Sequence, residues 1–73
     1  MARHVINADI TGTVFKIETS VGAAVAADST LIVLESMKME IPVDAPIAGT
    51  VAEILVAEGE AIAEGQALIV IEG

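Results

Sequence analysis

The sequence predicts an all-β fold, a flattened β-barrel or sandwich made of two quasi-symmetric halves. Three observations indicate this class. Hydrophobic residues make up 55% of the 73-residue chain and are mostly Ala, Ile and Val; Ile and Val favour strands because their branched side chains pack well on a pleated surface. Short apolar runs alternate with turn-forming residues, and no window carries a long apolar stripe of helical period. The third observation is an internal repeat.

The repeat appears when the sequence is shifted by 37 positions, so that residues 8–36 align with residues 45–73 without a gap. Of the 29 aligned pairs, 13 are identical, and they include Ile10/Ile47, Gly12/Gly49, Thr13/Thr50, Val14/Val51, Ile17/Ile54 and Gly22/Gly59. One such half is too small to bury an apolar face alone. Two interlocked halves can do so, and closing the sheet also protects strand edges. We therefore expect one domain over residues 1–73.

The same elements are expected in each half, in the same order. They are a strand that follows Gly-Thr-Val (14–18 and 51–56), a short segment (24–26 and 61–63) and the most apolar strand (31–34 and 68–71). Turns are expected at Asp28-Ser29 and Gly65-Gln66. Because turns often require positive φ, five glycines are also interpreted as turn residues: Gly12, Gly22, Gly49, Gly59 and Gly65.

The repeat also predicts where Lys38 lies. The strand at 31–34 runs toward Lys38, and its counterpart at 68–71 runs to the C-terminus. The segment at 40–44 starts just after Lys38, and its counterpart at 3–7 starts at the N-terminus. A two-fold axis relating the halves puts both termini at one end. Residues Met37-Lys38-Met39 should then form an exposed hairpin tip at the opposite end.

Composition and charge exclude several functions. The net charge of −8 argues against nucleic acid and anionic membranes as partners. No apolar run approaches membrane-spanning length, and no cationic leader precedes an apolar segment, so a cytoplasmic protein is expected. The chain has no cysteine and a single histidine, His4, which leaves no disulfide and no basis for a protein-made metal site. No phosphate loop or nucleophile–base pair is present, so no catalytic residue is predicted.

Lys38 is the residue that invites a functional interpretation. It falls in the segment that links the halves and is flanked by Met37 and Met39. In a strand the two methionines would lie on one side and Lys38 on the other, and thioethers around an exposed lysine suit a recognition surface. The plainer interpretation is that the methionines fill the core and Lys38 is an ordinary surface lysine. Spacing alone favours the plainer one.

Residues 35–40, Glu-Ser-Met-Lys-Met-Glu, resemble the attachment signature of biotinyl domains, usually Glu-Ala-Met-Lys-Met. The stretches at 45–51, 59–62 and 64–68 resemble the family's Ala-Pro-x-x-Gly-x-Val, Gly-Asp/Glu-x-Val and x-Gly-Gln-x-Leu. The resemblance covers nearly the whole chain and includes the two-half symmetry. The first half departs from it: Ala8-Asp9-Ile10 lacks the usual Pro, Asp28-Ser29 replaces Gly-Gln, and Ser36 replaces the common Ala.

The resemblance implies a biotin carboxyl carrier of a biotin-dependent acyl-CoA carboxylase. A biotin protein ligase would attach biotin to Lys38, with Glu35, Ser36, Met37, Met39 and Glu40 as the residues it recognises. Since lysine is almost fully protonated at neutral pH, the ligase must activate the amine. Lys38-linked biotin would then shuttle CO2 from a biotin carboxylase to a carboxyltransferase. The resemblance favours an acyl-CoA such as acetyl- or propionyl-CoA as acceptor, with pyruvate or urea as alternatives. The chain itself would be a non-catalytic carrier.

Three alternatives stay open. A lipoyl carrier shares the fold, but its lysine usually stands in Asp-Lys-Ala. An unmodified structural module of the same fold generally lacks the central Met-Lys-Met. A small acidic binding domain without a cofactor is the third. The mass of the protein after expression with a biotin ligase separates all of them.

Overall fold

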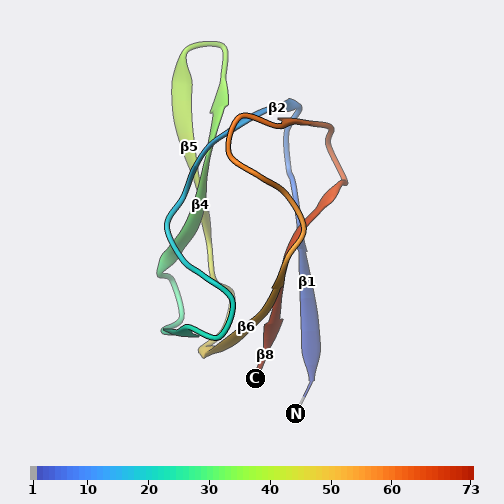
Figure 1. Ribbon diagram of the computed structural model, residues 1–73. Helices are drawn as coiled ribbons and strands as arrows, with labels where there is room; N and C mark the ends of the chain where they lie inside the picture. The colour runs from blue at the N-terminus through green and yellow to red at the C-terminus, as the bar shows by residue number, and fades with distance from the viewer. Residues whose placement is uncertain (1) are drawn as a thin grey trace.

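Two four-stranded antiparallel sheets face each other in the computed structural model, which describes residues 2–73 (Figure 1). One sheet has the strand order β1-β8-β6-β3 and the other β5-β4-β2-β7. The strands are β1 (Arg3–Asn7), β2 (Gly12–Ile17), β3 (Ala24–Val25), β4 (Thr30–Ser36), β5 (Met39–Asp44), β6 (Gly49–Ile54), β7 (Ala61–Ile62) and β8 (Ala67–Glu72). The all-β prediction is confirmed, with each expected strand found within a few residues.

The two halves interlock by exchanging their short strands. Strand β3 of the first half pairs with β6 of the second, and β7 of the second half pairs with β2 of the first. The pairing irregularities repeat as well: the register shifts between Val14 and Lys16 in one sheet and between Val51 and Glu53 in the other. This exchange closes the sandwich along one side with strands of only two residues, which leaves little open edge there.

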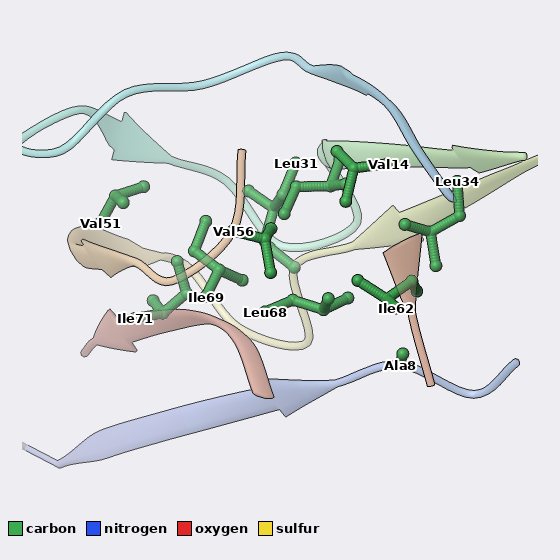
Figure 2. Packing of buried hydrophobic residues seen from close by; sticks show 12 residues of the cluster. Ala8, Val14, Leu31, Leu34, Val51, Val56, Ile62, Leu68, Ile69 and Ile71 are labelled. Carbon is green, nitrogen blue, oxygen red and sulfur yellow. The ribbon is translucent and has the colours of Figure 1, made fainter. Parts of the chain in front are cut away.

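The core lies between β4 and β8, the most apolar strand of each half (Figure 2). Leu31 and Ile32 on β4 are fully buried, as are their repeat counterparts Leu68 and Ile69 on β8. Other buried members come from both halves: Ala8, Val14, Leu34, Ala45, Val51, Val56, Ile62 and Ile71. Burial of these apolar side chains from both repeats is what holds a chain without disulfides together.

The five glycines divide into two groups, which corrects one prediction. Gly22, Gly59 and Gly65 have φ between 87° and 91° and lie in turns, as predicted. Gly12 and Gly49 do not form turns, because each is the first residue of a strand. There a Cβ would overlap the carbonyl oxygen of Glu35 or Glu72 on the neighbouring strand. These two glycines are therefore required by the close approach of two backbones.

The predicted placement of the hairpin is confirmed. The termini lie side by side at one end, where the N–H groups of Ala2 and Gly73 each donate to the other's carbonyl oxygen at 3.0 Å. The β4–β5 hairpin projects from the opposite end (green, top of Figure 1). Within residues 2–73 there is no helix that could cross a membrane.

Candidate functional site

The hairpin tip is a two-residue turn, with Met37 and Lys38 between the paired residues Ser36 and Met39. Both central residues have positive φ, 52° for Met37 and 65° for Lys38, as a type I′ turn requires. This corrects one detail of the prediction: the methionines do not alternate with Lys38 along a strand. Met37 lies in the turn itself, and Met39 begins β5.

The turn has a backbone conformation that Met and Lys residues rarely adopt. Type I′ turns are usually Asn-Gly or Asp-Gly, because side chains with Cβ atoms are crowded at positive φ. Each left-handed non-glycine residue costs about 1 kcal/mol. The turn is held by six residue pairs along β4 and β5, from Thr30 opposite Asp44 to Ser36 opposite Met39. The result is a short, defined tip at which Lys38 projects into solvent.

Both methionines of the hairpin are exposed, so they do not fill the core. The exposed fraction is 91% for Met37 and 64% for Met39. Their flexible thioether side chains are thus available for contact with a partner. The exposure of both methionines contradicts the core-filler interpretation.

The charges beside the turn are acidic and partly unpaired. Glu35 on β4 and Glu40 on β5 face each other across the hairpin, and both are exposed. Like charges directly opposite in a sheet are destabilising. Among residues 2–73, no ion pair includes Lys38; the three that form are Arg3–Glu53, Arg3–Glu72 and Lys16–Glu18. Within the described residues the Lys38 amine is therefore exposed and outside any ion pair.

Ser36, the remaining predicted recognition residue, makes a contact that sequence reasoning missed. Its hydroxyl donates to the carbonyl oxygen of Thr11 at 3.1 Å. The Thr11 hydroxyl in turn accepts a hydrogen bond from the N–H of Glu64 at 3.3 Å. Thr11 carries no motif, and only the sheet topology brings it next to the hairpin.

Two hollows in the described part of the chain lie away from Lys38. A shallow one of about 540 Å³ is lined by residues 17–20, 23–26, 29 and 30, in the loop region around β3. A smaller one of about 150 Å³ lies between β1 and β5 near Ile6 and Val43. No group of three His, Cys, Asp or Glu side chains within residues 2–73 is placed to hold a metal. Lys38 therefore lies on a projecting turn, outside both hollows.

The fold, two interlocked halves with a projecting hairpin, is that of a small carrier domain. The biotin–lipoyl family model, described as biotin-requiring enzyme, matches residues 2–71. The chain therefore belongs to the biotin–lipoyl family. A comparison with curated protein sequences gave no significant match.

Two solved structures show the same fold within much larger proteins. A single-chain, multi-domain long-chain acyl-CoA carboxylase is 34% identical, with a TM-score of 0.88 over 93% of this chain. The urea carboxylase of Kluyveromyces lactis is 30% identical, with a TM-score of 0.92 over 99% of this chain. The match spans only 7% of the first protein and 6% of the second. The chain thus resembles one small part of each carboxylase.

Proposed function

We propose that this domain is a biotin carboxyl carrier whose biotin is attached to Lys38. The observation that supports this most directly is the position of Lys38. It lies in an exposed turn between two exposed methionines, at the end of the molecule opposite the termini. A cofactor on this turn could enter the active site of another enzyme while the termini remain joined to other domains.

The surroundings of Lys38 suit an amide link to biotin. Acylation removes the positive charge of the amine, so an ion pair at Lys38 would be lost on modification; within residues 2–73 none forms. In the ligase, the Lys38 nitrogen would attack the carboxyl carbon of biotinyl-adenylate, lose a proton and release AMP. Because no carboxylate pairs with this amine in residues 2–73, we expect the ligase to supply a base or to desolvate the lysine.

When bound, biotin supplies a ring nitrogen that accepts a carboxyl group at one enzyme and releases it at another. The contribution of the chain is then to carry and orient its lysine. A side-chain link keeps the concentration of the cofactor high at both active sites, which we take to be a biotin carboxylase and a carboxyltransferase. The acceptor we propose is an acyl-CoA, in line with the acyl-CoA carboxylase among the similar structures.

The test is mass spectrometry of the intact protein after coexpression with a biotin protein ligase. We expect a mass increase of one biotinyl group, located on Lys38 by peptide mapping. Lys38→Arg should abolish the modification, and the matched control Lys16→Arg should leave it unchanged. A lipoyl adduct would favour the lipoyl alternative, and an unmodified chain would favour the structural module.

The carrier role has its own experiment. The biotinylated domain, mixed with a biotin carboxylase, ATP and labelled bicarbonate, should acquire label, whereas Lys38→Arg should not. ATP hydrolysis by the domain alone would contradict the carrier proposal.

A further inference from the structure

The hairpin leaves the body of the domain at Ser36. Strand β4 pairs with β2 only as far as Glu35, which faces Thr13. Beyond that point β4 pairs with β5 alone, through Ser36 and Met39. Residues 36–39 therefore project past the sheet, and Figure 1 shows the tip standing clear of the other strands. Whatever holds Ser36 sets the direction in which the tip points.

Ser36 is held by the loop between β1 and β2. Its hydroxyl donates to the Thr11 carbonyl oxygen at 3.1 Å, and its Cβ would lie 3.3 Å from a Cβ built on Gly12. Ser36 is half-buried, whereas Glu35, Met37 and Lys38 beside it are exposed. The side chain of Ser36 thus faces the body while its neighbours face solvent.

The loop that holds Ser36 is itself attached to the second half. The N–H of Glu64 donates to the Thr11 hydroxyl at 3.3 Å, and the N–H of Gly65 donates to the Ala8 carbonyl oxygen at 2.8 Å. The loop therefore rests on the turn before β8. A chain of hydrogen bonds runs from that turn through Thr11 to the base of the hairpin.

The other half of the molecule lacks this arrangement. The repeat counterpart of Ser36 is Gly73, and that of Thr11 is Ala48. Neither can form a side-chain hydrogen bond, although the backbones approach similarly, since a Cβ on Gly73 would lie 2.6 Å from the Ala48 carbonyl oxygen. Of the two matched ends, only the one that carries Lys38 thus has a hydroxyl side chain at both of these positions.

We infer that Ser36 is a positioning residue, which fixes the hairpin on the Thr11 loop and so preorganises Lys38 for the enzymes that receive it. The inference rests on the proposed function. A misplacement of about 1 Å can slow a reaction strongly. A hairpin tip that samples many directions also weakens the apparent affinity of the domain for an enzyme, because only the fraction of molecules in the competent conformation binds. This role differs from direct contact between the Ser36 hydroxyl and the ligase.

The first experiment uses the unmodified domain, with no ligase, and measures amide hydrogen exchange at Met39 and Ile41, which pair with Ser36 and Leu34 across the hairpin. Ser36→Ala should raise these exchange rates roughly two- to tenfold, the range for loss of one modest hydrogen bond. Ser36→Thr, which keeps the hydroxyl, should restore them. Ser29→Ala is the matched control, because Ser29 also donates to a backbone carbonyl, that of Ala26, at a distant loop. It should leave exchange in the hairpin unchanged.

The second experiment measures steady-state biotinylation. In Ser36→Ala the KM of the ligase for the domain should rise by the same roughly two- to tenfold, with kcat little changed. Unchanged exchange in the hairpin would overturn the inference, and a raised KM without faster exchange would instead indicate direct contact with the ligase. If the wild-type domain is not biotinylated, the proposed function fails. The exchange experiment still decides whether Ser36 restrains the hairpin.

Discussion

The two ends of the molecule have the same backbone arrangement but differ in their charged side chains. At the terminal end, Arg3 on β1 forms ion pairs with Glu72 on β8 and Glu53 on β6. The matching positions at the hairpin end are Glu40, Glu35 and Lys16. There Glu35 and Glu40 face each other without a cation between them. At the terminal end one arginine thus bridges two acidic groups, whereas at the hairpin end the two acidic groups face each other and Lys16 pairs with Glu18 instead.

The loops of the two halves differ in the same way. In the second half, the Glu60 carboxylate accepts from the Ala57 N–H at 3.1 Å, and the Gln66 side-chain oxygen accepts from the Ala63 N–H at 3.0 Å. The counterparts of Glu60 and Gln66 are Ala23, which has no polar side chain, and Ser29, whose hydroxyl donates to the Ala26 carbonyl oxygen instead. The shallow hollow of about 540 Å³ lies there. Repeated backbones thus tolerate divergent side chains wherever the core is not involved.

The largest effect should come from the two strand-start glycines. Gly12→Ala and Gly49→Ala should each lower the free energy of unfolding by about 1–3 kcal/mol, because the added methyl group overlaps the carbonyl oxygen of Glu35 or Glu72. Urea denaturation measures both losses. Only Gly12→Ala should also slow biotinylation, since Glu35 belongs to the hairpin. Equal slowing by both variants would mean that general destabilisation, not the hairpin, controls the reaction.

Transferring the loop side chains of one half to the other should change the free energy of unfolding, with opposite signs for the two transfers. The double change Ala23→Glu with Ser29→Gln should raise the free energy of unfolding by about 1 kcal/mol, as modest hydrogen bonds do. Glu60→Ala with Gln66→Ser should lower it by a similar amount, because it removes the bonds to Ala57 and Ala63. Thermal denaturation of both double variants measures the two changes in stability. If Ala23→Glu with Ser29→Gln lowered the free energy of unfolding, the two loops would not be equivalent.

A smaller effect is expected when the charge pattern of the terminal end is copied to the hairpin. Glu40→Arg places a cation opposite Glu35 and should stabilise the domain by about 0.2–1 kcal/mol. Arg3→Glu is the mirror change and should destabilise it. If the acidic pair serves the ligase, Glu40→Arg should also raise the KM for biotinylation despite the added stability. A lower KM would rule out that use of Glu40.

The smallest effect on stability should come from the hairpin methionines. Because Met37 and Met39 are exposed, replacing both with Ala should change the free energy of unfolding by less than about 0.5 kcal/mol. The ligase reaction should nonetheless slow, since the thioethers are proposed contacts. A loss of about 2–5 kcal/mol would instead indicate buried side chains.

Much of the fold could be predicted because it repeats. The pairs Leu31/Leu68 and Ile32/Ile69 mark the strand that each half buries, and the alignment of 8–36 with 45–73 implies a two-fold arrangement. From that arrangement the exposure of Met37, Lys38 and Met39 opposite the termini follows. Attachment of biotin at Lys38 is still a proposal, because it rests on a motif and a position.

Sequence alone determined the class of fold, the buried strands and the segment that projects, because periodic apolar residues and a gapless repeat are local patterns. Tertiary structure decided which backbones approach closely. Gly12 looks like a turn glycine in the sequence, yet it is required where β2 meets the Glu35 carbonyl group. Thr11 carries no signal, yet it binds both Ser36 and Glu64. Such contacts join residues 25 and 53 positions apart, and the pairing of β2 with both β4 and β7 in one sheet brings them together.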